Sequence, residues 1–240
     1  MSTTQPTQPT QQSEPTARVD TRDMVTVHRF LRREFRLLPD VVRSVVPGDT
    51  ARVTVVADHL EFLTTFLHHH HTAEDNNLWP IMLERVPDEL APLVELMESQ
   101  HHRVDELLQL VGGIVPQWRV SVDAARREEL AGLLAELSAA LDEHMEAEED
   151  HILPLAARTV TEAEWDAIGA EASAHHAKDI LPLLLGMIRY EGDPEVIAEM
   201  LAKAPRIIRL LAPALSGRAF RKYALAVHGT ATPPRIGLRA

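Results

Sequence analysis

The sequence contains no cysteine, and only 4% of its residues are aromatic. Without cysteine the chain cannot form disulfides, thiolate zinc sites, iron–sulfur clusters or a cysteine nucleophile, and this fits a reducing compartment. No apolar run approaches the roughly 20 residues that a transmembrane helix needs. We therefore expect a cytoplasmic protein without a transmembrane segment.

Sequence motifs of several enzyme classes are also missing. The chain has no glycine-rich phosphate loop, no His-Glu-x-x-His motif of zinc proteases and no Gly-x-Ser-x-Gly elbow of serine hydrolases. The net charge of −12 argues against nucleic acid as the main partner. What is unusual among the 240 residues is the number of histidines, which is 13.

Composition and periodicity divide the chain into four parts. Residues 1–22 are rich in Ser, Thr, Gln and Pro, so we expect a disordered tail that is not a secretory signal peptide. Residues 23–160 have the pattern of an all-α, up-and-down four-helix bundle, and residues 161–228 that of a C-terminal helical extension. Residues 229–240 are predicted to be a loose basic tail.

Four amphipathic segments carry the prediction of the bundle. In each of them apolar side chains recur at steps of three or four, which is the spacing of one helix face. The segments cover residues 24–38, 53–81, 93–111 and 130–155. Pro39 is expected to end the first helix, and Gly112, Gly113 and Pro116 are expected to end the third.

Two segments of the chain resemble each other at an offset of 74 residues. HHTAEDNNLWP (His70 to Pro80) aligns with HMEAEEDHILP (His144 to Pro154), with His, Glu and Pro at the same relative positions. This echo indicates a duplicated helix pair in which each copy supplies one His-x-x-x-Glu motif.

Histidines and glutamates interrupt the apolar stripes on the helix faces that are expected to be buried. Six residues fall on these faces: His28, His70, Glu74, His101, His144 and Glu148. Residues i and i+4 of a helix stack about 6 Å apart, so each His-x-x-x-Glu pair points inward together. Unpartnered burial would cost several kcal/mol per group. Hydrogen-bonded networks could offset this cost, but a pair of iron or manganese ions bridged by the carboxylates is the more economical solution.

Helix faces also decide between neighbouring histidines. His102 lies on the polar face of the third helix, whereas His101 lies on the apolar face. His68 and His69 fall away from the stripe that contains His70, and His71, which lies closer to that stripe, stays an open choice.

The residues quoted above resemble a known family. The phrases VHRFLRREF, HHHHTAEDNNLWP, MESQHHRV and EHMEAEEDHILP are similar to the hemerythrin-like proteins, specifically to bacterial members of the HHE cation-binding domain family, from about residue 24 to 156. The resemblance implies a non-heme di-iron centre, that is, two Fe ions joined by an oxo or hydroxo bridge, with Mn as an alternative metal. It carries over the same six ligands: His28, His70, Glu74, His101, His144 and Glu148.

The chain departs from the oxygen-carrying hemerythrins at two positions. They have a second histidine one turn on in the third helix, where this chain has Asp105, and they end in His-x-x-x-x-Asp, where this chain has Glu148 with Glu149 at the longer spacing. One ligand fewer would favour reaction with hydrogen peroxide, dioxygen or nitric oxide over reversible oxygen binding. The alternative is an oxygen, iron or redox sensor, or an iron-sequestering module, without catalytic turnover.

A ferritin-like carboxylate site is a competing interpretation of the same helices. It would use the Glu-x-x-His pairs Glu98 with His101 and Glu148 with His151. We regard it as the weaker one, because Glu98 is on the polar face and the two pairs fall on consecutive helices.

The C-terminal extension adds further candidates. A fifth helical segment is expected over about 162–190, broken near Pro182, and its His175 and His176 could orient ligands of the metal or simply pack. Residues 201–240 contain eight Lys or Arg and no Asp or Glu. This basic segment is expected to pack on the acidic bundle or to contact a lipid surface or an acidic partner.

Overall fold

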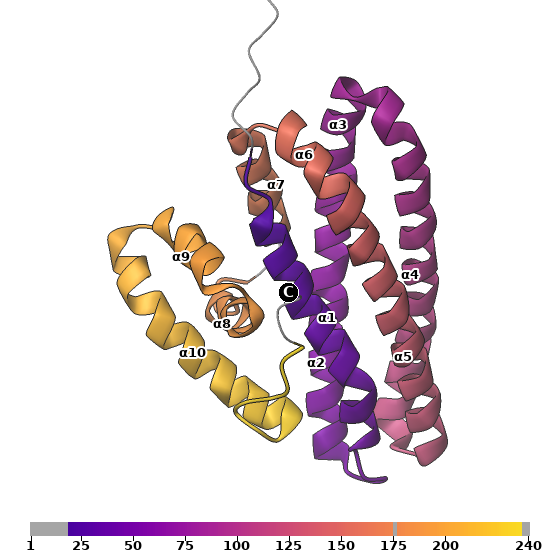
Figure 1. Ribbon diagram of the computed structural model, residues 1–240. Helices are drawn as coiled ribbons and strands as arrows, with labels where there is room; N and C mark the ends of the chain where they lie inside the picture. Colours follow the sequence, from indigo (N-terminus) through magenta and orange to yellow (C-terminus); the bar gives the residue numbers. More distant parts are fainter. Residues whose placement is uncertain (1–18, 175–176, 237–240) are drawn as a thin grey trace, which may run out of the picture.

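The computed structural model describes residues 19–174 and 177–236, and this part of the chain is helical and contains no strand. Four long helices form an antiparallel bundle, as predicted (Figure 1). They are α1 (Arg22–Arg43), α2 (Thr50–Ala73), α4 (Pro87–Ser121) and α5 (Ala124–Ala147). Among the described residues, no helix combines the length and apolarity that crossing a membrane requires.

The second and fourth bundle helices continue in the same way, which confirms the internal echo. Each passes directly into one turn of π-helix and then into a short α-helix. These elements are η1 (Glu74–Leu78) and α3 (Trp79–Arg85) in the first copy, and η2 (Glu148–Ile152) and α6 (Leu153–Thr159) in the second. Pro80 and Pro154 lie in the first turns of α3 and α6, directly after the π-helical turns, and each lacks the N–H that would donate to the preceding turn.

Two bundle helices run past the residues that were expected to end them. Pro39 lies inside α1, which ends at Arg43, and α4 passes through Gly112, Gly113 and Pro116 to Ser121. These boundary predictions were wrong because tertiary packing outweighs the local penalty of proline and glycine. In α4, for example, Trp118 lies beyond the predicted end and is buried in the core.

The C-terminal extension consists of four further helices against the side of the bundle that α1 and α2 form (Figure 1). The expected break near Pro182 separates the first two of them. Most of the basic segment forms the last and longest helix, which packs mainly on the second, the one that follows the break. The four are α7 (Glu162–Ala174), α8 (Leu181–Glu191), α9 (Pro194–Ala202) and α10 (Arg206–His228).

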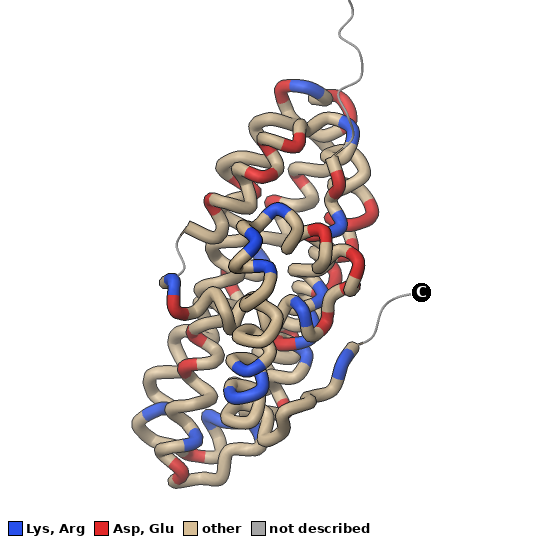
Figure 2. The backbone as a smooth tube through the Cα atoms, turned by 90° about the vertical axis from the view of Figure 1, so that its left-hand side faces the viewer, with Lys and Arg blue, Asp and Glu red and all other residues tan. Residues whose placement is uncertain are grey.

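Charge is distributed unevenly on the face that carries the extension. Figure 2 shows Lys and Arg along the C-terminal helices in the middle of this face, and Asp and Glu mostly around them. One contact across this boundary is made by Lys203, whose ammonium lies 2.7 Å from Asp166 and 3.3 Å from Glu162 of α7.

The predicted tails are only partly covered by the described residues, because 1–18 and 237–240 lie outside them. Val19 is buried, and its N–H donates to the carbonyl of Ala157 at 3.1 Å. The segment after α10 is held on α8, where the Tyr190 hydroxyl donates to the carbonyl of Pro233 at 2.8 Å. Ile236 also donates its N–H to Glu191 at 3.0 Å, so residues 229–236 are packed rather than loose.

The interior of the bundle is apolar except at one level. Leu67, Met97 and Leu141 are buried there, and each fully buried leucine contributes about 1.5–3 kcal/mol to stability. At the level of the π-helical turns the apolar core is interrupted by a layer of histidine and glutamate side chains.

Candidate metal centre

All six residues singled out from the sequence are buried, and the fold brings them together. They come from all four helices of the bundle and from the π-helical turns that follow α2 and α5. With one additional histidine they form two groups of four, and within each group one ligand atom per residue lies within 4.8 Å of the others.

The first group contains His28, His70, Glu74 and Glu148. The Nε2 atom of His28 lies 3.3 Å from Oε2 of Glu148. In the same way, Nε2 of His70 lies 3.2 Å from Oε1 of Glu74, its partner four residues on. Two imidazoles and two carboxylates therefore face a common point.

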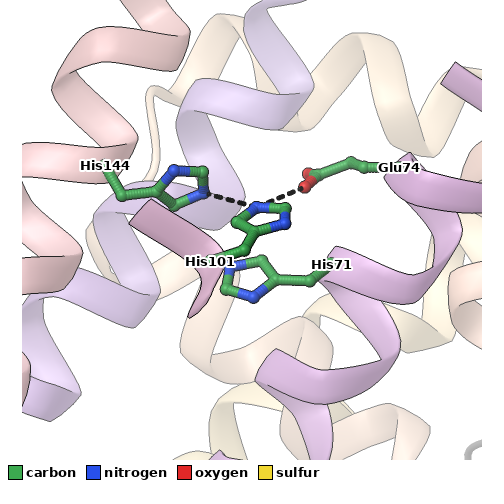
Figure 3. A group of neighbouring side chains, drawn as sticks. All are labelled: His71, Glu74, His101 and His144. Carbon is green, nitrogen blue, oxygen red and sulfur yellow. Dashed lines mark hydrogen bonds and ion pairs between the residues drawn. The ribbon is translucent and has the colours of Figure 1, made fainter. Parts of the chain in front are cut away.

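The second group contains His71, Glu74, His101 and His144 (Figure 3). The Nε2 atoms of His101 and His144 are 3.2 Å apart, and Nε2 of His101 lies 4.0 Å from Oε2 of Glu74. The ring of His71 stacks on that of His101, with 4.2 Å between the ring centroids. Figure 3 shows the three imidazoles and the carboxylate pointing toward one another.

The two carboxylates connect the groups. Glu74 belongs to both, with Oε1 toward His70 and Oε2 toward His101. Oε2 of Glu148 lies 3.3 Å from His28 and 3.9 Å from Nε2 of His144, which belongs to the second group. The carboxylates thus lie between the two sets of histidines, so that each group of four could hold a cation.

The hydrogen-bonding state of the cluster tests whether it fits a metal. No hydrogen-bond partner is present among the described residues for Nε2 of His28, His70 and His71, or for both carboxylate oxygens of Glu74 and Glu148. A buried polar atom without a partner costs about 1–3 kcal/mol, and more where it is charged. A bound cation would supply the missing partner to each of these atoms, so the donor set fits imidazole- and carboxylate-binding metals such as iron and manganese.

Comparison with known proteins agrees with this site. The sequence profile of the family described as "Hemerythrin HHE cation binding domain" matches residues 19–156, which is more than half of the chain. The chain belongs to the hemerythrin HHE cation-binding domain family. The same profile also matches residues 92–203, a range that begins 73 residues after the first, close to the offset of the internal echo. No curated protein and no solved structure matches the chain significantly.

His71 is the cluster member that the sequence left undecided in this HHE domain. It is buried, whereas His68 and His102 are exposed, as the helix faces predicted. A signal for His71 was available, because it lies four residues after Leu67 and three before Glu74, both on the inward face. The π-helical turn that begins at Glu74 changes the angle between successive side chains around the helix axis. Such turns often occur at functional sites.

Asp105 does not enter the centre. Its side chain is exposed on α4, one turn beyond His101. The third bundle helix therefore supplies a single histidine, and the additional imidazole comes from α2 as His71. The sequence predicted one ligand fewer than in the oxygen carriers because Asp105 stands where they have a histidine. That prediction did not count His71.

Glu149 lies outside the ligand groups but contacts one of them. Its Oε1 is 2.9 Å from Nδ1 of His28, and it also pairs with Arg32. On the opposite side, Oδ1 of Asp75 lies 3.4 Å from Nδ1 of His101. Acceptors on the far nitrogen of an imidazole fix its tautomer and leave Nε2 facing the centre.

Burial and neighbouring charges set the protonation of the cluster. Burial lowers the pKa of His70 and of His144 to about 3, so both imidazoles are neutral and carry a free lone pair. Burial, followed by the charge of Glu148, raises the pKa of Glu74. For Glu148 itself burial acts in the same direction, but the contact with His28 and the charges of His144 and His70 together outweigh it and lower the pKa to about 2.

The ferritin-like alternative was wrong. It requires Glu98 and His151 in the core, and the structure places both on the surface. Of the candidates on the fifth segment, His175 and His176 lie outside the described residues.

An apolar cavity leads to the centre. It has a volume of about 230 Å³, and His70 and Glu74 lie in its wall. The remaining wall is mostly apolar and comes from α1, α2, α7, α8 and α9, with Met24, Trp165 and Ile188 among its residues. The extension therefore covers one side of the centre and leaves room for a small molecule.

Proposed function

We propose that this protein is a non-heme di-iron member of the HHE family that binds or reacts with a small ligand, namely dioxygen, hydrogen peroxide or nitric oxide. The observation that supports this best is the pair of four-residue groups that share Glu74. In this proposal His28, His70, Glu74 and Glu148 hold one ion, and His71, Glu74, His101 and His144 hold the other. The ions supply redox chemistry and Lewis acidity to the bound ligand.

The protein's own contribution is to position the ligands and to exclude water. The neutral imidazoles of His70 and His144 present lone pairs, and Glu74 and Glu148 supply the negative charge that offsets two cations. Leu67, with the other apolar residues around the cluster, keeps bulk water out, which strengthens electrostatic interactions within the site.

The size and polarity of the cavity favour a diatomic molecule or a peroxide as the ligand. A volume of about 230 Å³ is below the roughly 300–1,000 Å³ of typical ligand pockets. Its mostly apolar wall suits dioxygen and nitric oxide in particular, because these molecules lose little hydration on entry. A larger polar substrate would have less room than it needs, and most of the wall would offer it no hydrogen bond.

Metal content and the absorption spectrum of protein from iron-supplied cells test the proposal. We expect about two irons per chain with charge-transfer bands of a bridged pair. The variants Glu74→Ala and His144→Ala should lose iron, whereas His102→Ala, which changes an exposed side chain, should retain it. Manganese in place of iron would change the metal assignment, and a chain without either metal would refute the proposal.

A second candidate function is a sensor without catalytic turnover. The observation that favours it is the position of α7 and α8, which form one wall of the cavity, so that a molecule in the cavity contacts the extension. Mixing the iron-loaded protein with hydrogen peroxide separates the two candidates. Oxygen release with turnover supports an enzyme, whereas ligand binding without turnover supports the sensor if the protease sensitivity of residues 162–240 also changes with the metal. Iron binding with neither effect would indicate iron sequestration.

A further inference from the structure

A separate group of buried ligand atoms lies where the last turn of α10 meets α1 and α2. Glu34 of α1, His59 of α2 and His228, the last residue of α10, each direct one atom to a common point. Oε2 of Glu34 is 3.4 Å from Nε2 of His59 and 3.2 Å from Nε2 of His228. None of these residues belongs to the candidate metal centre described above.

These three atoms are buried and have no hydrogen-bond partner in the described part of the chain. The side chains of Glu34 and His59 are fully buried, and that of His228 is 5% exposed. Two ligand atoms that each lie about 2.0–2.1 Å from one zinc-type cation at a tetrahedral angle are about 3.3–3.4 Å apart. The distances of 3.4 and 3.2 Å from Glu34 to the two imidazoles are close to this spacing.

The Nδ1 atom of His59, which faces away from Glu34, has a hydrogen-bond partner, as metal-binding histidines commonly do. This atom lies 2.9 Å from the hydroxyl of Tyr223 in α10. When Nδ1–H donates to this hydroxyl, Nε2 carries a lone pair that faces Glu34 and His228. A lone pair that faces a carboxylate oxygen is repelled unless a positive charge lies between the two. This tautomer is therefore the one that a cation selects.

The remaining oxygen of Glu34 has a partner of its own. Arg33 donates to Oε1, and its guanidinium lies 5.0 Å from the ring centroid of Tyr190 and 5.2 Å from that of Phe220. The aromatic faces help to hold the guanidinium by cation–π attraction. Oε1 is thus occupied by Arg33, whereas Oε2 is left to face the two imidazoles.

We propose that Glu34, His59 and His228 form a mononuclear site for a divalent transition-metal cation of the zinc type, which fastens the end of α10 to the bundle. Two imidazoles and one carboxylate are a common ligand set for such ions. A neighbouring contact holds the same helix end in place, because Arg52 of α2 donates to the carbonyls of Ala226 and Val227. The cation would add a second connection between the extension and the bundle.

Zinc content of the full-length protein tests this site. Chelator-treated protein is reloaded with zinc alone, dialysed and analysed for metal, in parallel with His59→Gln, His228→Gln and the exposed-histidine control His151→Gln. We expect both site variants to bind about one zinc per chain less than the wild type and the control. This difference does not depend on whether the di-metal centre is filled. Equal zinc content in all four proteins would overturn the proposal and leave a purely hydrogen-bonded network.

A local measurement keeps the test decisive if a variant folds poorly. Amide hydrogen exchange of residues 222–228 is followed in wild-type protein with and without zinc. We expect zinc to slow this exchange about tenfold or more, and to do so equally in His144→Ala, which changes the di-metal centre only. Zinc-independent exchange at the end of α10 in folded wild-type protein would refute the site. Replacing Glu34 is avoided, because it would leave the buried charge of Arg33 without its partner.

Discussion

The Nδ1 atom of His28 lies 2.9 Å from Oε1 of Glu149, while Nε2 of the same ring faces Glu148. Two consecutive glutamates thus contact opposite sides of one imidazole. Glu148 is fully buried within a ligand group, whereas Glu149 is 19% exposed and also pairs with Arg32. We infer that Glu148 is a ligand and that Glu149 is a positioning residue.

This assignment predicts different effects of replacing the two glutamates. Glu149→Ala should lower iron affinity about 10–100-fold, because His28 loses the acceptor that orients it. Glu149→Gln, whose amide oxygen can still accept from Nδ1, should recover most of that affinity, and Asp150→Ala at the exposed next position should have no effect. Iron titrations followed by absorption measure these affinities. If Glu149→Gln lost iron as completely as Glu148→Ala, Glu149 would be a ligand itself.

The four consecutive histidines of α2 give a second prediction. His71→Ala should reduce the iron content as much as His101→Ala does, because both imidazoles belong to the same ligand group. His68→Ala is the matched control, since it removes an exposed imidazole from the same run. Iron analysis of the three purified variants decides the matter. Full iron content in His71→Ala would restrict the second group to Glu74, His101 and His144.

Helical periodicity was sufficient to place most members of the cluster on buried helix faces. Positions separated by three or four residues share a face, so an interruption of the apolar stripe by His28 or His101 could be assigned to the core. His70 and His71 could not be separated in this way, because adjacent residues differ by about 100° around a helix and both can border one face. The π-helical turn after them could not be foreseen from the pattern.

Other features depend on contacts between distant parts of the chain. Pro39 and Pro116 are breakers by local rules, and only the packing of the whole bundle lets α1 and α4 continue past them. The group formed by Glu34, His59 and His228 requires the position of α10 against α2. Periodicity gives the faces of single helices but not which helices meet, so this group was not found from the sequence.

Access to the metal centre through the apolar cavity can be tested by filling the cavity. Ala172 of α7 lines it, so Ala172→Phe should slow the reaction of the iron-loaded protein with nitric oxide about tenfold or more without changing iron content. Ala167→Phe places the same side chain on the exposed side of the same helix and is the control. Stopped-flow absorption measures the rates. Equal rates in wild type and both variants would show that ligands enter by another path.

Packing of the extension depends on one glycine. A Cβ atom at Gly186 in α8 would lie 2.7 Å from Cβ of Phe220 and would also press on the carbonyl of Ser216 in α10. Gly186→Ala should therefore lower the free energy of unfolding by about 1–3 kcal/mol, as overpacked sites do. Gly217→Ala in α10 meets open space and should instead raise it by up to about 1 kcal/mol. Urea unfolding measures both, and a shift of the same sign in the two variants would contradict the close approach of α8 and α10.

The start of α7 should give a pH-dependent contribution to stability. Glu164 accepts from the Thr161 N–H at 2.9 Å and from two nitrogens of Arg85, at 2.8 and 2.6 Å. The hydrogen bond from Arg85, followed by that from the Thr161 backbone, lowers the pKa of Glu164 to about 2. A carboxyl group whose pKa is lower in the folded than in the unfolded state stabilises the protein above its ordinary pKa. That stabilisation is lost as the pH falls from the ordinary pKa toward about 2.

Glu164→Gln should therefore lower the free energy of unfolding by about 1 kcal/mol near neutral pH, the usual contribution of a helix cap together with a partly exposed ion pair. The difference from wild type should shrink as the pH falls from about 5 toward 3, because the carboxylate of the unfolded wild-type chain is then protonated. Urea unfolding at a series of pH values measures it, with Glu136→Gln, at an exposed position of α5, as the control. A difference that stays constant over this range would mean that Glu164 contributes through its shape and not through its charge.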